Sequence, residues 1–256
     1  MRNWIGGRGF VAALLLGGGV LALPAAARTN HALIVAVTKY PNVQGADLVV
    51  PNNDAVLVRD YLTSSAPVPF APQNVTVLAD GVDGAIASPT KQAIKDQLAA
   101  LAGRVERGDF VFLQLGGHGM QQPAADPASE PDGMDEVFLP ADIGQWTDIK
   151  AGVPSALTDN EIGSALDEIR EKGAFVWIVI DACHSGTATR AAGTAVDDVT
   201  ERMLRPGQLG IPDSAIAESV ARTEAMSSKG ASWLISSSSR WATAGSGGRG
   251  CSDFSF

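Results

Sequence analysis

Five short apolar runs, separated by longer helix-like segments, constrain the fold of this chain more than any other feature. Most of the runs are rich in β-branched residues and lack the alternation of a half-exposed strand, which is typical of buried parallel strands. The runs cover residues 31–37, 75–78, 110–115, 175–180 and 233–235. Strands that alternate with helices predict an α/β fold, a three-layer sandwich with a mainly parallel central sheet and helices on both faces.

The segments between the runs carry helix signals. One helix is expected over residues 52–62, with an apolar face formed by Val56, Leu57, Tyr61 and Leu62. A second is expected to start with Ser88 as its N-cap, because a proline follows in the first turn. A third begins at Thr158, which forms a capping box with the glutamate three residues later.

Two long stretches lack a clear period and are expected to be mostly irregular. They cover residues 116–136 and residues 186–230, and the second has room for one helix near residues 215–226. Loops of this length in a compact domain usually carry function. In parallel sheets the functional loops follow the carboxyl ends of the strands, so these stretches are where a site is expected.

The first 27 residues have the features of a signal peptide. Arg2 and Arg8 supply positive charge, an apolar glycine-rich stretch follows over residues 10–23, and small residues precede a cleavage site after Ala27. The apolar stretch is too short for a spanning helix, although an uncleaved membrane anchor is the alternative. We therefore expect the folded domain to cover residues 28–256 and to be exported, to a periplasm or to the medium, without a stable membrane span.

The charge balance excludes one class of partner. The chain has 19 basic and 28 acidic residues, a net charge of −9. Loss of the two arginines of the signal peptide would bring the mature chain to −11. A nucleic-acid-binding protein needs a basic face, so no nucleic-acid partner is expected.

Two strand ends carry reactive side chains. The run at 110–115 leads into Gly-Gly-His118-Gly119, and the run at 175–180 leads into Asp181-Ala-Cys183-His184. If the two strands are neighbours, His118 and Cys183 face each other at the carboxyl edge of the sheet. A thiol needs a base to become the reactive thiolate at neutral pH, and imidazole is the usual partner. The glycines beside His118 leave backbone N–H groups available for an oxyanion.

Other roles for these residues stay open on the local pattern alone. In an oxidising compartment, Cys183 and Cys251 could form a disulfide. Cys183, His184 and His118 could also bind zinc, although the chain has no paired spacing typical of zinc ligands and no evident fourth ligand.

These motifs resemble the caspase-fold cysteine peptidases of family C14, and most closely the metacaspase-like bacterial branch. The resemblance extends beyond the two strand ends to three further segments, and together they span residues 31–190 in order. The segments are Pro51-Asn-Asn-Asp54-Ala, Asp132-Gly-Met-Asp135-Glu-Val-Phe-Leu-Pro-Ala-Asp142 and Thr158-Asp159-Asn160-Glu161.

The resemblance implies a caspase-like fold and a cysteine endopeptidase. Cys183 aligns with the nucleophile and His118 with the general base, and the N–H groups of Gly119 and Cys183 align with the oxyanion hole. Asp54 and Asp181 align with the walls of the specificity pocket. Two carboxylates select a cationic side chain, so peptide or protein substrates with Arg or Lys before the scissile bond are expected.

The chain departs from the family pattern at several positions. Leu115 and Gly116 stand where the family often has Tyr-Ser, so a pocket hydroxyl is missing. Asp135, Asp159 and Asn160 align with calcium ligands, but Asn160 replaces an acid and Arg190 stands where another acid is expected. No cofactor is expected to be required, and any calcium site should be weak or absent.

The resemblance also predicts an incomplete carboxyl-terminal end, because the segment after residue 250 is similar to the approach to a final helix that does not follow. The alternatives to an active peptidase are a caspase-fold pseudoenzyme that only binds peptides and a legumain-like or gingipain-like peptidase. The long stretch at 186–230 is a candidate for self-cleavage, with Arg202 and Arg222 as the preferred sites.

Overall fold

The computed structural model describes residues 28–126, 129–182 and 203–228, with side chains described up to residue 226. Several sequence predictions lie outside the described residues: those on residues 1–27, Cys183, Arg190, Cys251 and the run at 233–235. The expectations that concern them are therefore not addressed by the structure.

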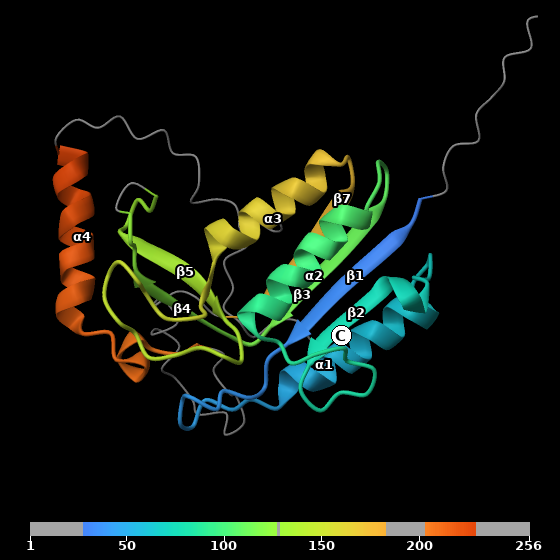
Figure 1. Ribbon diagram of the computed structural model, residues 1–256, viewed down its shortest axis with the longest axis horizontal. Coiled ribbons are helices and arrows are strands. Elements are labelled where there is room, and N and C mark those ends of the chain that lie inside the picture. The colour runs from blue at the N-terminus through green and yellow to red at the C-terminus, as the bar shows by residue number, and fades with distance from the viewer. Residues whose placement is uncertain (1–27, 127–128, 183–202, 229–256) are drawn as a thin grey trace, which may run out of the picture.

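A four-stranded parallel sheet forms the centre of the molecule, in the order β2-β1-β3-β7. Its strands are β1 (Asn30–Ala36), β2 (Val75–Ala79), β3 (Phe110–Gly116) and β7 (Phe175–Asp181). Each lies within one or two residues of a run predicted from the sequence. Helices cover both faces of this sheet, so the predicted α/β class is confirmed (Figure 1).

The two faces of β1 show how the helices are placed. Leu33 and Val35 point into a core formed with α2 (Lys91–Arg104) and α3 (Asp159–Glu171), which lie side by side across the sheet in Figure 1. The residues between them in sequence, such as Ala32 and Ile34, point into a smaller core with α1 (Val50–Asp60) on the opposite face. Side chains alternate along a strand, so a strand that is apolar at every position must be covered on both faces.

The helix ends differ in part from the sequence predictions. The N-cap of α2 is Thr90 rather than Ser88, because the Thr90 hydroxyl accepts a hydrogen bond of 3.2 Å from the Ala93 amide. The capping box at Thr158 is confirmed. The apolar face predicted for the helix at residues 52–62 is correct only in part, since Leu62 is buried, whereas Leu57 and Tyr61 are 59% and 52% exposed.

A second sheet lies beside the first, where the sequence analysis expected irregular structure. It is antiparallel in the order β4-β5-β6. Its strands are β4 (His118–Pro123), β5 (Met134–Leu139) and β6 (Leu157–Thr158). The later helix α4 (Asp213–Ser228) packs against it, at the left of Figure 1, and confirms the helix expected near residues 215–226.

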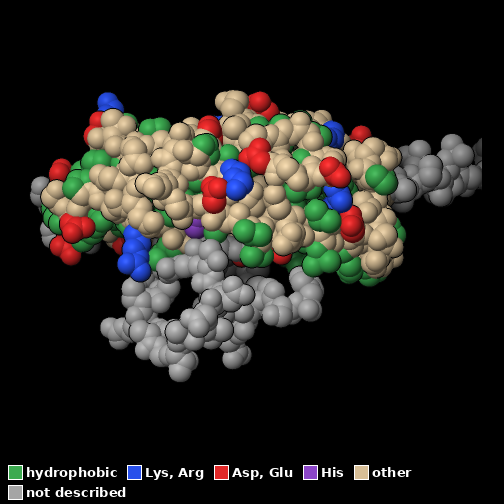
Figure 2. Space-filling view, turned by 90° about the horizontal axis from the view of Figure 1, so that it is seen from below, with side chains coloured by type: hydrophobic (Ala, Val, Ile, Leu, Met, Phe, Trp, Pro, Cys, Tyr) green, Lys and Arg blue, Asp and Glu red, His purple; other side chains and the backbone are tan. Residues whose placement is uncertain are grey.

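The described surface is charged in a mixed pattern. Figure 2 shows acidic and basic side chains interspersed among polar and apolar ones on the face seen from below. No continuous basic stripe is visible among the described residues of that face. None of the helices in the described ranges has the length and apolar character that crossing a membrane requires.

Candidate functional site

His118 lies where the chain passes from the parallel sheet into the second sheet. Only Gly117 separates the end of β3 from the start of β4, so the histidine stands at the carboxyl edge of the parallel sheet. Its side chain is almost fully buried, with 3% exposed. The loop after β1 covers it, and the Ala46 carbonyl lies 2.8 Å from the His118 Nε2 atom.

That contact fixes the tautomer of the imidazole. A backbone carbonyl can only accept a hydrogen bond, so Nε2 must carry the proton that it donates to Ala46. In the neutral ring, Nδ1 is then the basic nitrogen, and this atom is also shielded from bulk solvent. His118 is thus held in one orientation, with its Nε2 proton directed at the loop after β1.

Tyr40 holds the backbone of the histidine and was not identified from the sequence. Its hydroxyl accepts a hydrogen bond of 2.8 Å from the His118 amide and donates one of 3.1 Å to the Leu139 carbonyl. The two rings lie 4.9 Å apart at their centroids. Because all three groups are buried, Tyr40 couples the loop after β1 to β4 and β5 of the second sheet.

Gly117 is required by this packing. A Cβ atom at this position would lie 2.9 Å from the Tyr40 hydroxyl and 3.1 Å from the Val37 Cβ, closer than such atoms approach. The sequence analysis assigned the glycines beside His118 to the binding of an oxyanion. For Gly117 the structure gives a different reason, which is the space taken by Tyr40.

Replacing Tyr40 with Phe is expected to lower the free energy of unfolding by about 1–3 kcal/mol. The change leaves the buried His118 amide and Leu139 carbonyl without the hydroxyl that they share. Urea denaturation monitored by circular dichroism measures the difference. Tyr61→Phe is the matched control, because that side chain is half exposed and its change should stay within about 0.5 kcal/mol. Equal effects of the two changes would contradict the role given to Tyr40.

The two predicted pocket carboxylates come from elements that meet at the same edge. Asp181 ends β7, and its register partner on β3 is Gly116. The Cβ position of Gly116 lies 3.6 Å from the Pro51 Cβ, so the first turn of α1 sits against this strand end. Asp54 lies one turn further along α1 and is partly buried, as is Asp181. The sequence-predicted residues are thus placed at the edge that holds His118.

A side chain with a hydroxyl, which the family often has at the position of Gly116, would fit here without a clash. The nearest atoms to a Cβ at this position are at ordinary van der Waals distance. The absence of a side chain at residue 116 therefore leaves space at the edge between Pro51 and the β7 end.

The predicted oxyanion residue Gly119 lies inside β4. It pairs with Phe138 of β5 on one side and with Met203 on the other. Its carbonyl accepts a hydrogen bond of 3.1 Å from the Leu204 amide. Cys183, the other predicted oxyanion donor and the predicted nucleophile, follows Ala182, the last described residue after β7.

Three acidic side chains form a buried cluster at the second sheet. Glu130, Asp135 and Asp159 each present a carboxylate oxygen, and these oxygens lie within 4.8 Å of one another. Asp135 and Asp159 were predicted as metal ligands, and the structure brings them together. Asn160, the third predicted ligand, instead donates its amide to the Glu130 carboxylate at 3.2 Å. Glu130 was missed because no motif of the sequence singled it out.

The close packing of these carboxylates changes how they titrate. Burial, and then the charges of Asp159 and Asp135, raise the pKa of Glu130 to about 8. Burial and the charge of Asp159 raise the pKa of Asp135 to about 6. Such oxygens are the donors that calcium prefers, so the cluster fits a hard divalent cation, which would neutralise the mutual repulsion. Only one oxygen of each of the three carboxylates converges, whereas calcium takes six to eight oxygens. At neutral pH a cation must also displace the Glu130 proton, so we expect weak binding.

The cluster predicts a pH dependence of stability. Between the ordinary and the raised pKa values, the folded chain holds protons on Glu130 and Asp135 that the unfolded chain has lost. The contribution of this cluster to the free energy of unfolding should therefore fall as the pH rises from about 4 to about 8. Glu130→Gln should remove the largest part of this pH dependence, because Glu130 has the most strongly raised pKa of the cluster. In the presence of a chelator, the stability of the variant relative to wild type should rise steadily over this range.

Thermal unfolding at a series of pH values, with chelator or with millimolar calcium, measures both effects. Glu171→Gln on the exposed end of α3 is the matched control and should follow wild type at every pH. Calcium is expected to raise the midpoint at pH 8 by only a few degrees, and not at all in Glu130→Gln. A pH-independent difference between Glu130→Gln and wild type would show that the cluster does not titrate as described.

Comparisons with known proteins agree with this arrangement. The family described as metacaspase, peptidase C14 domain, matches residues 30–192. Metacaspase-1B of Neurospora crassa is 31% identical over 116 residues, which cover 45% of this chain and 25% of that protein. Metacaspase-1 of Arabidopsis thaliana is 29% identical over 135 residues, covering 53% and 34%. Metacaspase-1 of Eremothecium gossypii is 27% identical over 159 residues, covering 62% and 32%.

The chain thus spans about a third or less of the length of these curated relatives. The family match, in contrast, extends over more than half of the chain, from β1 past the strand end that leads to Cys183. It covers His118, Asp54, Asp181 and the acidic cluster in one continuous stretch. The chain therefore belongs to the metacaspase, peptidase C14 domain, family.

Proposed function

We propose that this chain is an exported cysteine endopeptidase that cleaves peptide bonds after Arg or Lys through Cys183 and His118. The observation that carries the proposal is the state of His118. Its Nε2 proton is fixed on the Ala46 carbonyl, which leaves Nδ1 as the base at the edge where β7 leads into Cys183.

In the proposed reaction, Nδ1 of His118 takes the thiol proton of Cys183, and the thiolate attacks the substrate carbonyl. The negative charge that develops on the carbonyl oxygen is stabilised by the N–H groups of Gly119 and Cys183. His118 then gives the proton to the leaving amine. A water molecule, deprotonated by the same nitrogen, hydrolyses the thioester and frees the thiol.

Asp54 and Asp181 are proposed to bind the cationic side chain of the substrate. Their elements meet at the edge that holds His118, through the contact of Pro51 with Gly116. Hydrogen bonds between a guanidinium group and carboxylates are stronger than neutral ones and favour Arg geometrically. Lys offers a single ammonium group to the same two acids, so it should be accepted less well.

Export is proposed from residues 1–27 alone, through the positive, apolar and small-residue regions of a signal peptide. The protein would then act in a periplasm or outside the cell on peptide or protein substrates.

The proposed function is tested by labelling the mature protein with a peptidyl-arginine fluoromethylketone and mapping the modified residue by mass spectrometry. We expect one label, on Cys183, and its loss in His118→Ala, because the thiol then lacks its base. Label on Cys251 instead, or binding of the peptide portion without any covalent label, would favour a peptide-binding protein without activity.

A further inference from the structure

A cavity of about 520 Å³ lies at the carboxyl edge of the parallel sheet, beside the loop that holds His118. Its lining comes from the loop after β1, the residue after β2, the residues that precede α2 and the residues after β5. Asp47 lines it and directly follows Ala46, whose carbonyl accepts the His118 Nε2 proton. The volume is typical of cavities that bind small ligands. The cavity and the proposed base thus share one loop.

The order of the strands places this cavity on the leaving-group side of His118. Asp181 ends β7, His118 comes after β3, and the cavity lies at the ends of the next two strands, β1 and β2. In the proposed reaction His118 protonates the leaving amine, so the substrate chain after the scissile bond should run past His118 and away from β7. Neighbouring strands are about 4.8 Å apart and an extended chain rises about 3.3 Å per residue, so the cavity is within reach of about the second or third residue after that bond.

The walls of the cavity are held by hydrogen bonds between segments that are distant in the sequence. The Asn42 side chain donates a hydrogen bond of 2.9 Å to the Ile143 carbonyl, which ties the loop after β1 to the segment after β5. The amide of Lys91, the first residue of α2, donates one of 2.8 Å to the Asp142 carboxylate. The cavity is therefore formed before a ligand enters it, which lowers the cost of binding.

The charged side chains of the cavity leave an excess of negative charge. Lys39 is the one cation among its lining residues, and its Nζ atom lies 2.8 Å from the Asp47 carboxylate. The hydrogen bond from Lys39, and then one of 3.0 Å from the Tyr40 amide, hold the pKa of Asp47 below its usual value. Lys39 and Asp47 therefore neutralise each other. Asp80 and Asp142 also line the cavity, and within the described residues neither forms an ion pair with a basic side chain.

Asp80 is the carboxylate best placed to bind a ligand. It directly follows β2, is partly buried, and its backbone carbonyl accepts a hydrogen bond of 2.7 Å from the Asn52 side chain. In the described part of the chain its carboxylate accepts no hydrogen bond, whereas one oxygen of Asp142 already accepts the Lys91 amide. A cationic side chain that enters the cavity would therefore gain a charge-assisted hydrogen bond to Asp80 without displacing another partner.

We infer that this cavity is a second substrate subsite, in which Asp80 binds an Arg or Lys side chain about two or three residues after the scissile bond. The inference rests on the proposed function and adds a substrate class to it, peptides with a basic residue on each side of the cleaved bond. Because the two acidic sites lie on opposite sides of His118, a substrate that fills both is held across the reacting bond. Contacts of this kind keep the scissile carbonyl in a reactive position.

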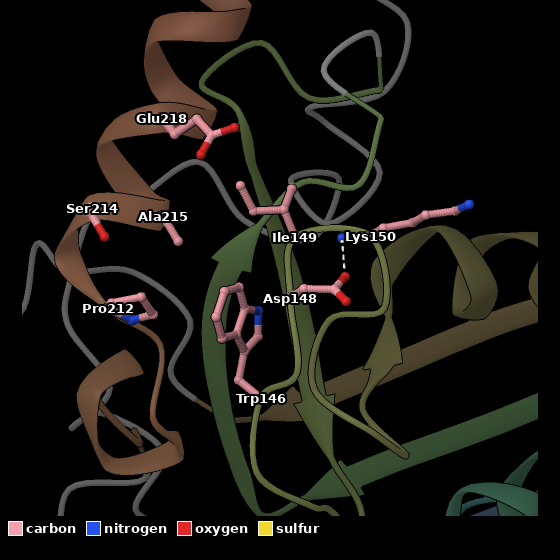
Figure 3. A pocket seen from close by; sticks show the side chains of 8 residues that line it. All are labelled: Trp146, Asp148, Ile149, Lys150, Pro212, Ser214, Ala215 and Glu218. Atoms are coloured by element: carbon pink, nitrogen blue, oxygen red, sulfur yellow. Dashed lines mark hydrogen bonds between the residues drawn. The ribbon is translucent and has the colours of Figure 1, made fainter.

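A different cavity of the same molecule serves as a comparison. It measures about 440 Å³, and Figure 3 shows Trp146 and Ile149 on one side of it and Ala215 and Glu218 of α4 on the other. None of the residues that line it belongs to the parallel sheet or directly follows one of its strands. Glu218 thus supplies a carboxylate that lines a cavity without being near the carboxyl edge, and its substitution is a control for Asp80.

The test uses internally quenched peptides that share an Arg before the scissile bond and carry Lys, Gln or Glu at the second or the third residue after it. For wild type, kcat/KM should be about 3- to 10-fold higher with Lys than with Gln at one of these positions, and lowest with Glu. Asp80→Asn should bring the ratio of Lys to Gln close to one. Glu218→Gln, and Asp83→Asn on the exposed loop after β2, should keep the wild-type ratio. Each ratio is taken within one sample, so the fraction of active molecules does not affect it.

Two further measurements on wild type complete the test. The ratio of Lys to Gln should fall toward one as the salt concentration rises, because salt screens a contact at a partly exposed carboxylate. A peptidyl-arginine aminocoumarin, which has no amino acid after the scissile bond, reports the proposed function alone. Its hydrolysis without a preference for Lys in the longer peptides, or with a preference that salt or Asp80→Asn leaves unchanged, would overturn the inference while the proposed function stands. A preference for Glu would do the same. Absence of hydrolysis of every substrate would overturn the proposed function and the inference with it.

Discussion

Replacing Cys183 or His118 with Ala is expected to reduce kcat/KM for a peptidyl-arginine substrate by about 10⁴-fold or more. The first change removes the proposed nucleophile. The second removes the proposed base, whose tautomer is fixed by the Ala46 carbonyl. Losses of this size are typical when one member of a nucleophile–base pair is deleted, since the remaining groups cannot complete the reaction. Initial rates over a range of substrate concentrations give the value for each variant.

The control for this experiment is His184→Ala. His184 follows Cys183 directly and is needed only if the two residues bind zinc together with His118. We expect this variant to keep its activity and wild type to be insensitive to a zinc chelator. Activity that survives in purified Cys183→Ala, or that disappears in His184→Ala together with bound zinc, would refute the thiol mechanism.

Substrates with Arg before the scissile bond should be hydrolysed about 10²- to 10⁴-fold faster than matched substrates with Asp. Asp54 and Asp181 would each contribute a charge-assisted contact of about 1.5–3 kcal/mol, and about 1.4 kcal/mol corresponds to a tenfold change. Asp54→Asn and Asp181→Asn should each lower kcat/KM for the Arg substrate by about 10- to 100-fold. A panel of fluorogenic peptides that differ only at this residue measures the preference.

Asp60→Asn is the matched control for the pocket. Asp60 is the last residue of α1, its side chain is exposed, and it contacts only its neighbour Arg59 among the ion pairs of the described residues. Its substitution should leave the ratio of Arg to Asp hydrolysis unchanged. Faster turnover of the Asp substrate, or an equal loss in Asp60→Asn and Asp181→Asn, would remove Asp54 and Asp181 from the pocket.

The parallel sheet could be predicted from the sequence because its signal is local. Each of its strands is a continuous apolar run, as in Phe110–Gly116, and a run of this kind is stable only when both faces are covered. The capping box at Thr158 is equally local, since both partners lie within one turn. The family could be inferred from the sequence for the same reason, because the two strand-end motifs and the three further segments that resemble it are each short and local.

The second sheet could not be predicted in this way. β4 contains two glutamines and a glycine, and its stability comes from antiparallel pairing with β5, which lies more than ten residues further along the chain. The apolar face of α1 was misjudged in part for a related reason. Leu57 and Tyr61 satisfy the helical period but are more than half exposed, because the core on this side of the sheet is formed with Ala55 and Leu62.

At the candidate site, the sequence by itself determined the kinds of group present: an imidazole, a thiol and two carboxylates at strand and helix ends. The tertiary structure decided which other side chains and backbone groups contact them and fix their positions. Tyr40 and the Ala46 carbonyl fix His118 from a loop more than seventy residues away, and Glu130 joins Asp135 and Asp159 from a turn without a motif. Hydrogen bonding and mutual repulsion act over a few ångströms in space, and no local pattern records which distant backbone and side-chain groups the fold brings within that range.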